Sequence, residues 1–140
     1  MMSPLLKAIA KIHTAVMRIS GGRMGNQMGG NEILLLHHVG AKSNKNYVSP
    51  LAYVEDEGAY AIIAAAAGQA KNPGWFHNLK KNPSTIIEIK GKTINVTAKV
   101  APKETRDRIW ADVVVDFPQF ASYEEKTTRV IPIVLLHPQS

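Results

Sequence analysis

Two stretches of the sequence carry residue types that suit ligand binding, one of them an anion and the other a flat ligand. The first is the turn Gly40-Ala41-Lys42-Ser43-Asn44-Lys45-Asn46, which is rich in the glycine, asparagine and serine that turns favour. Its backbone amides, with the Lys42 ammonium and the Ser43 hydroxyl, form a candidate anion-binding nest. The alternative is a plain hairpin tip that carries solvated lysines.

The second stretch runs from Lys71 to Pro83, where two Asn-Pro pairs bracket a predicted helix. Asn72 is the expected cap, and Pro73 suits the first turn because no amide donor is lost there. Pro83 should end the helix, since the residue before a proline avoids the helical region.

Aromatic side chains on this helix lie beside a run of small residues. Trp75 and Leu79 share one helical face, with Phe76 next to them. The preceding segment, Ala59–Ala67, is predicted as a strand almost free of side chains, and it leads into a glycine loop. Such an arrangement lets a flat ligand approach the backbone. The alternative is that the three apolar side chains plug one end of a barrel.

Metal and nucleophile chemistry have little support. His37 and His38 are adjacent in the predicted strand Glu32–Val39, so they should point to opposite faces and cannot readily bind one metal ion together. No other histidine and carboxylate spacing suggests a metal site. Cysteine is absent, and there is no Walker loop, Rossmann fingerprint or Ser-His-Asp set.

The remaining patterns indicate short antiparallel hairpins, which favour a small barrel. Pro50 and Pro132 suggest edges or bulges within two of the strands. The three predicted helices cover Pro4–Ile19, the segment between the two Asn-Pro pairs, and Pro102–Val115. The six predicted strands are Glu32–Val39, Tyr47–Val54, Ala59–Ala67, Thr85–Lys90, Lys92–Ala101 and Arg129–His137.

The first helix, Pro4–Ile19, is amphipathic, with a stripe that contains Lys7, Lys11 and Arg18. It either packs on its own barrel or lies on an anionic lipid surface. The glycine-rich residues 21–31 then form a flexible connection.

Composition indicates one globular domain over residues 1–140. The net charge of +6 favours an anionic partner such as phosphate, acidic lipid or nucleic acid. No apolar run reaches the length of a membrane span, and a chain without cysteine is expected to be cytoplasmic, in contact with the membrane surface at most.

The sequence resembles the deazaflavin (coenzyme F-420)-dependent nitroreductase and quinone reductase family. The most specific part of the likeness is Asn72-Pro73-Gly74-Trp75-Phe76-His77-Asn78-Leu79. The likeness covers roughly Ile33 to Pro138 and includes Gly40-Ala41-Lys42-Ser43, Ser49-Pro50-Leu51, Asn82-Pro83, the segment from Phe117 to Tyr123, Thr127, Arg129 and Ile131-Pro132.

The resemblance implies a mainly β fold with helices: a six-stranded antiparallel split β-barrel of the flavin-binding type. It implies that reduced coenzyme F-420 delivers hydride to a quinone, a nitro compound or an activated alkene, with FMN as the alternative cofactor. By resemblance, Lys42 and Ser43 meet the phosphate side of the coenzyme. The other cofactor residues that it implies are Val48, Ser49, Pro50, Ala64, Ala65, Ala66, Trp75, Phe76, His77 and Asn78.

The same resemblance places Phe117, Phe120 and Tyr123 on the substrate side, although aromatics at intervals of three also suit a core stripe. Tyr123 is then the candidate catalytic residue, because the other two positions carry tyrosine in some members of the family. The turn also departs from the family, which usually has arginine where Ala41 and Tyr47 stand. Arginine makes bidentate phosphate contacts that tyrosine cannot make.

Three functions follow as hypotheses. The first is a deazaflavin-dependent oxidoreductase. The second, suggested by the missing arginines, is a non-catalytic carrier of the coenzyme or of a lipid. The third is a nucleic-acid binder, which the positive charge allows but no recognition motif supports.

Overall fold

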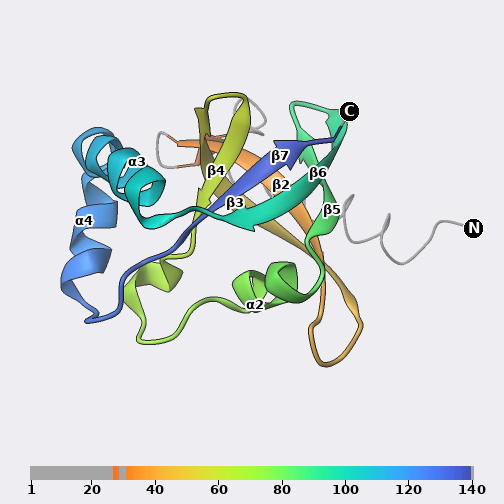
Figure 1. Ribbon diagram of the computed structural model, residues 1–140, viewed down its shortest axis with the longest axis horizontal. Coiled ribbons are helices and arrows are strands. Elements are labelled where there is room, and N and C mark those ends of the chain that lie inside the picture. Colours follow the sequence, from red (N-terminus) through yellow and green to blue (C-terminus); the bar gives the residue numbers. More distant parts are fainter. Residues whose placement is uncertain (1–26, 29–30, 140) are drawn as a thin grey trace, which may run out of the picture.

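The chain folds into a closed barrel of six antiparallel strands, as a computed structural model that describes residues 27–28 and 31–139 shows (Figure 1). Around the barrel the strand order is β2-β3-β4-β7-β6-β5, and β2 closes the circle by pairing with β5 at Leu35–Glu88 and Leu36–Ile87. The strands are β2 (Asn31–Val39), β3 (Asn46–Asp56), β4 (Ala59–Ile63), β5 (Ser84–Ile89), β6 (Lys92–Val100) and β7 (Ile133–Pro138). The expected six-stranded antiparallel barrel is confirmed.

Two tight hairpins follow from local turn chemistry. The β3–β4 turn is Glu57-Gly58 and the β5–β6 turn is Lys90-Gly91, and all four residues have positive φ angles between 48° and 84°. Two consecutive left-handed residues match the twist of the flanking strands, and glycine reaches this region without steric cost. The predicted pairing of β5 with β6 across Gly91 is confirmed.

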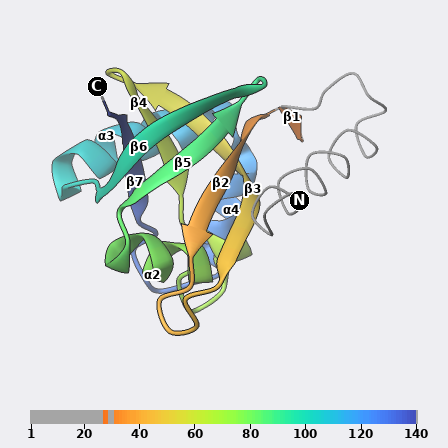
Figure 2. The same ribbon diagram turned by 90° about the vertical axis from the view of Figure 1, so that its right-hand side faces the viewer.

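Two apolar clusters hold the fold together. The first fills the barrel and includes Leu34, Leu36 and Ile62 from the strands. Helix α2 (Gly74–Lys81) adds Trp75, Phe76 and Leu79 to it, so the helix closes one end of the barrel, as Figure 2 shows. The plug that the sequence suggested is therefore present.

The second cluster lies between the barrel wall and the helices α3 (Lys103–Asp116) and α4 (Pro118–Glu125). Ile109, Trp110 and Val113 are the buried residues of α3, at the helical spacing expected from the sequence. Partly buried Phe120 and Tyr123 of α4 pack against the same cluster. Both helices lie on the same side of the barrel (Figure 1).

Three local predictions are wrong. The alanine-rich strand ends at Ile63 instead of Ala67, and residues 66–68 form the 3-10 turn η1 (Ala66–Gly68). The last strand begins at Ile133 instead of Arg129, and it is not an edge, because β4 and β6 pair with its two sides. Helix α2 is preceded by Pro73 and has no side-chain cap, so Asn72 is not its cap.

The remaining predictions concern the edge position of Pro50, the first 31 residues and membrane-spanning helices. Pro50 lies where β3 pairs with β2 alone, since β4 pairs only with Tyr53–Asp56, so its edge position is confirmed. The predicted helix Pro4–Ile19 lies outside the described residues. Within the expected flexible connection, strand β1 (Gln27–Met28) pairs with the start of β2. Across the described ranges, no helix has the length and apolar character to cross a membrane.

Candidate functional site

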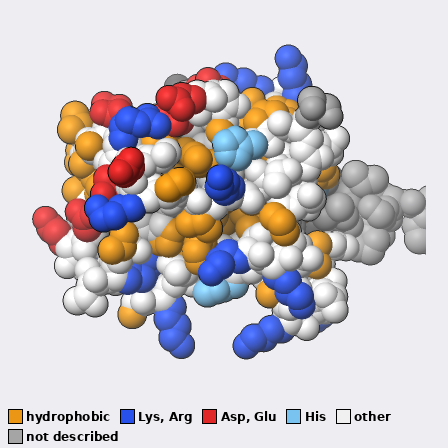
Figure 3. Space-filling view, in the orientation of Figure 1, with side chains coloured by type: hydrophobic (Ala, Val, Ile, Leu, Met, Phe, Trp, Pro, Cys, Tyr) orange, Lys and Arg blue, Asp and Glu red, His pale blue; other side chains and the backbone are white. Residues whose placement is uncertain are grey.

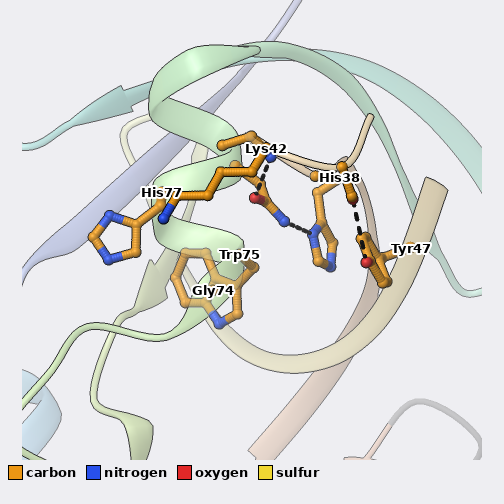
Figure 4. A pocket seen from close by; sticks show the side chains of 10 residues that line it. His38, Lys42, Tyr47, Gly74, Trp75 and His77 are labelled. Carbon is orange, nitrogen blue, oxygen red and sulfur yellow. Dashed lines mark hydrogen bonds between the residues drawn. The ribbon is translucent and has the colours of Figure 1, made fainter. Parts of the chain in front are cut away.

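A cavity of about 650 Å³ opens where the β2–β3 turn meets the start of helix α2. The turn and the helix come together because α2 closes the barrel end from which the turn projects (Figure 2). The cavity is lined by His38, Gly40, Ala41, Lys42, Ser43, Tyr47, Gly74, Trp75, His77 and Asn78. Figure 4 shows this lining, with Lys42 and His77 on one side and Tyr47 on the other.

The turn is held open by its own backbone. The Gly40 amide donates to the Lys45 carbonyl at 2.8 Å, and the Asn44 amide donates to the Gly40 carbonyl at 3.0 Å. A Cβ atom at position 40 would stand 2.3 Å from the Ser43 hydroxyl oxygen and 3.2 Å from the Tyr47 ring, so a side chain there would displace these two neighbours. The turn thus presents the exposed Lys42 and Ser43 beside the cavity.

A chain of polar contacts ties this turn to helix α2 and to strand β3. The Ala41 amide donates to Asn78 Oδ1 at 2.8 Å, and Asn78 Nδ2 lies 2.9 Å from His38 Nδ1. On its far side, His38 Nε2 lies 2.9 Å from the Ser49 hydroxyl oxygen. Burial, and then the neighbouring His37, lower the pKa of His38 to about 4, so its imidazole is neutral at pH 7.

A second cavity of about 390 Å³ lies on the other side of Trp75, which lines both. Its floor is formed by Ala65, Ala66 and Ala67, called the alanine turn below, and its wall includes Phe120 and Tyr123 of α4. The complete lining is Ile33, Pro50, Leu51, Ala52, Ile63, Ala65, Ala66, Ala67, Pro73, Trp75, Gln119, Phe120 and Tyr123. This cavity is mostly apolar, which suits a flat hydrophobic ligand.

The alanine turn has an unusual backbone that one side chain holds in place. Ala66 and Ala67 have φ angles of 48° and 54°, the left-handed region that costs energy for residues other than glycine. Arg129 donates to the carbonyl oxygens of Ala64 at 3.1 Å, Ala65 at 2.8 Å and Gln69 at 3.0 Å. It also donates to Asn72 Oδ1 at 2.7 Å, which explains why Asn72 does not cap α2.

The two ends of the molecule differ in charge. Acidic side chains gather around α3 and the β3–β4 turn, whereas mostly basic side chains surround the end closed by α2 (Figure 3). Of these, Lys42 lines the first cavity, and Lys81 reaches the turn by donating to the Ala41 carbonyl at 2.6 Å. An anionic group is therefore favoured at the cavity mouth.

The residues predicted from the sequence to bind cofactor or substrate lie around two different cavities, and a few of them line neither. It brings Lys42, Ser43, Trp75, His77 and Asn78 into the first cavity, and Pro50, Ala65, Ala66, Phe120 and Tyr123 into the second. Ser49 reaches the first cavity through His38. Ala64 and Val48 are buried and line neither cavity. Phe76 belongs to the barrel core, and Phe117 lines neither cavity but contacts the Phe120 ring edge-on.

Sequence reasoning missed His38, Tyr47 and Arg129 as neighbours of these cavities. His38 follows Leu34 and Leu36 at intervals of two, which is a signal that it points inward. Tyr47 stacks on His38, with ring centroids 5.5 Å apart and planes inclined by 21°. The role of Arg129 had no local signal, because its partners lie about 60 residues away in the chain.

Comparison with known proteins adds a family match. Residues 9–138 match the family model described as F420H(2)-dependent quinone reductase. An F420H(2)-dependent quinone reductase of Mycobacterium tuberculosis (strain ATCC 25618 / H37Rv) is 36% identical over 132 residues, which cover 91% of this chain and 89% of that protein. A putative F420H(2)-dependent quinone reductase of the same strain is 42% identical over 106 residues, covering 76% and 89%.

Solved structures agree with the fold. A structure described as an F420-H2 dependent reductase superposes with a TM-score of 0.67 at 36% identity, covering 75% of this chain and 93% of its own. Another, described as a domain-swapped dimer, has a TM-score of 0.67 at 30% identity and covers 92% and 98%.

Proposed function

Because this chain belongs to the F420H(2)-dependent quinone reductase family, we propose that it is an oxidoreductase that transfers a hydride from reduced coenzyme F-420 to a quinone. The observation that carries the proposal is that Trp75 lines two mainly apolar cavities, the first of which has the Lys42 ammonium at its mouth. A flat ring with an anionic tail would occupy the two environments together.

The residues present fit such a coenzyme. The side-chain-free position Gly40, the exposed Lys42 ammonium and the Ser43 hydroxyl suit the anionic tail. The floor of the second cavity consists of Ala65, Ala66 and Ala67, whose methyl groups leave room for a flat ring above the backbone. The absence of arginine at Ala41 and Tyr47 reduces the number of charged donors, but Lys42 and Ser43 remain available to the anionic tail.

The chain's residues then bind, orient and exclude water, while the bound coenzyme supplies the hydride. Lys42 and Ser43 hold the anionic end, and Ser49 and Pro50 run beside the coenzyme's chain. The backbone at the buried residues Val48 and Ala64 supports the two cavities from the barrel core. Trp75, Phe76, His77 and Asn78 form the helix side of the site, with Phe76 acting from the barrel core.

The acceptor side is built from α4 and the residue that precedes it. Phe120 and Tyr123 line the second cavity, and Phe117 supports Phe120 through its edge-on contact. The Tyr123 hydroxyl is the candidate hydrogen-bond donor to the acceptor's carbonyl oxygen, where negative charge develops as hydride arrives. Nitro compounds and activated alkenes present a similar flat, electron-poor group, so we extend the proposal to them.

The test is a pair of measurements on the purified full chain. Calorimetric titration should show that oxidised coenzyme F-420 binds more tightly than FMN, and the absorbance of reduced F-420 should decay when a quinone is added. Tighter binding of FMN would overturn the cofactor assignment. Binding without turnover of quinones, nitro compounds or alkenes would make the protein a carrier instead of an enzyme.

We also propose a cytoplasmic location with peripheral membrane contact through residues 4–19, on the basis of the Lys7, Lys11 and Arg18 stripe. Each basic residue near an anionic surface contributes about 1 kcal/mol at low salt. Sedimentation with anionic vesicles should retain the full chain more strongly than a chain without residues 1–20. Equal binding by both would show that this segment has another role.

A further inference from the structure

The protonation state of His38 can be read from its neighbours. A backbone amide can only donate a hydrogen bond, so the Asn78 atom that faces the Ala41 amide at 2.8 Å must be the carbonyl oxygen Oδ1. The amide group of Asn78 is therefore fixed, with its NH2 directed at His38 Nδ1, 2.9 Å away. An NH2 group donates and does not accept, so His38 Nδ1 carries no proton.

The same reasoning continues to strand β3. A neutral histidine without a proton on Nδ1 carries it on Nε2, which lies 2.9 Å from the Ser49 hydroxyl oxygen. His38 Nε2 therefore donates to Ser49, and the hydroxyl hydrogen of Ser49 is free to donate to another acceptor. All donors in this relay run one way, from the Ala41 amide through Asn78 and His38 to Ser49.

The relay is shielded and has no carboxylate partner within it. His38 is 7% exposed and Tyr47 of β3 stacks on its ring. The titratable or charged side chains that face this region are Tyr47 on β3, Lys42 on the turn, and His77 and Lys81 on α2, and the neighbouring His37 on β2 also acts on His38 through its charge. A second proton on His38 would therefore meet a neutral amide donor and nearby cations, both of which oppose it.

We propose that His38 is a positioning residue for coenzyme binding: its neutral Nε2–H form links the Gly40–Asn46 turn, through Asn78, to Ser49 on strand β3 and so holds the turn in the position that binds the coenzyme. This inference rests on the proposed function and adds to it which group orients the site. His38 acts through Asn78 and Ser49, so it sets coenzyme affinity without contacting the transferred hydride. If His38 were protonated, its Nδ1–H would face the Asn78 NH2 group, and two donors cannot form a hydrogen bond. The turn would then lose either the Asn78–His38 contact or the contact between Asn78 and the Ala41 amide.

Asn78→Asp is the sharpest test, because it creates a pH dependence of coenzyme affinity between pH 8 and 5.5 that the wild-type relay does not have. A carboxylate still accepts from the Ala41 amide, but it can meet His38 only if Nδ1 gains a proton. The pKa of His38 in the variant should therefore rise to its ordinary value or above it, since an opposite charge within hydrogen-bond distance favours the charged form. Coenzyme affinity of the variant should be about tenfold weaker than wild type at pH 8 and should recover as the pH falls towards 5.5.

Asn82→Asp is the matched control, because it introduces the same charge at the end of the same helix, outside the relay. Wild type and this control should show similar affinities at both pH values, and any titration of the coenzyme itself appears in all three proteins. If Asn78→Asp follows the same pH profile as the control, the proposal is wrong.

The tautomer is measurable without any coenzyme. In the wild-type protein at pH 7, nitrogen-15 NMR of the His38 ring should show the pattern of a neutral imidazole protonated on Nε2. A proton on Nδ1 would overturn the proposal even if Asn78→Asp failed to fold. Conversely, the expected tautomer with no binding of coenzyme F-420 by any of the three proteins would overturn the proposed function and not the relay.

Discussion

The Arg129 guanidinium donates through Nη2 to the Ala65 carbonyl oxygen at 2.8 Å, across 64 positions of the sequence. Three further hydrogen bonds from the same guanidinium reach Ala64, Gln69 and Asn72. One side chain thus fixes the carbonyl groups on both sides of the left-handed Ala66-Ala67 pair. The floor of the second cavity depends on a residue that does not line it.

Arg129→Lys should lower the free energy of unfolding by about 2–4 kcal/mol, because an ammonium cannot reproduce the planar fork and hydrogen bonds to charged groups contribute roughly 1.5–3 kcal/mol each. Urea unfolding followed by circular dichroism gives the value. Arg108→Lys is the control: Arg108 is 48% exposed and binds Asp56 through two hydrogen bonds, so solvent screens this pair and the substitution should destabilise the protein clearly less than Arg129→Lys. Equal losses of unfolding free energy in the two variants would show that the alanine turn keeps its conformation without Arg129.

Lys42→Ala should weaken binding of coenzyme F-420 about tenfold to a hundredfold at low salt, because one charged hydrogen bond is removed at the cavity mouth. The loss should shrink as salt rises, and turnover at saturating coenzyme should change little. Calorimetry and steady-state kinetics measure both. Lys45→Ala is the control, since Lys45 is exposed on the same turn but does not line the cavity. If Lys42→Ala leaves the dissociation constant unchanged, Lys42 is only a hairpin-tip lysine.

Gly68→Ala should destabilise the protein more than Gly58→Ala, although both glycines have φ angles near +80° (82° and 84°). A Cβ at position 68 would lie 2.7 Å from the Tyr123 carbonyl oxygen, whereas one at position 58 would meet nothing within 4 Å. The left-handed backbone alone costs roughly 1–2 kcal/mol, so the excess reports the contact between η1 and α4. Thermal unfolding of both variants would show it, and similar melting temperatures would contradict the close contact.

The free energy of unfolding should fall as the pH drops from about 7 to 5. Burial lowers the pKa of His37, and burial with the charge of His37 lowers that of His38 to about 4, while unfolded histidine keeps a value near 6.5. The unfolded chain therefore binds more protons in this window, so stability is complete above about pH 6.5 and is lost below it. His38 alone should account for ~2 kcal/mol by pH 5. His38→Gln should flatten the curve, and an unchanged slope would exclude His38 as its cause.

The strands and hairpins were predictable where local patterns determine them. Alternation in β6 and the glycine at Gly91 specify one hairpin, and the two Asn-Pro pairs mark helix α2 within one or two residues. The end of β4 was not predictable, because alanines suit a strand, a turn or a core equally well and so carry no period.

The candidate site shows the same division. Lys42 and Ser43 stood out because the turn chemistry is local, and Trp75 because its helix is locally bracketed. Asn72 was misread as a helix cap, since its actual partner, Arg129, belongs to a segment 57 positions away. Groups recruited by long-range hydrogen bonds leave no signature in a short stretch of sequence.

The position of β7 between β4 and β6 has a consequence for biosynthesis. A nascent chain that has emerged only as far as α4 holds the β3–β4 and β5–β6 hairpins, but the strand that joins them is still inside the ribosome. Until residues 133–138 emerge, β4 and β6 each present an unpaired edge, and Leu136 cannot yet occupy the core. Barrel closure therefore waits for the last strand of the barrel to emerge, and the interval before it is when these edges expose the chain most to aggregation.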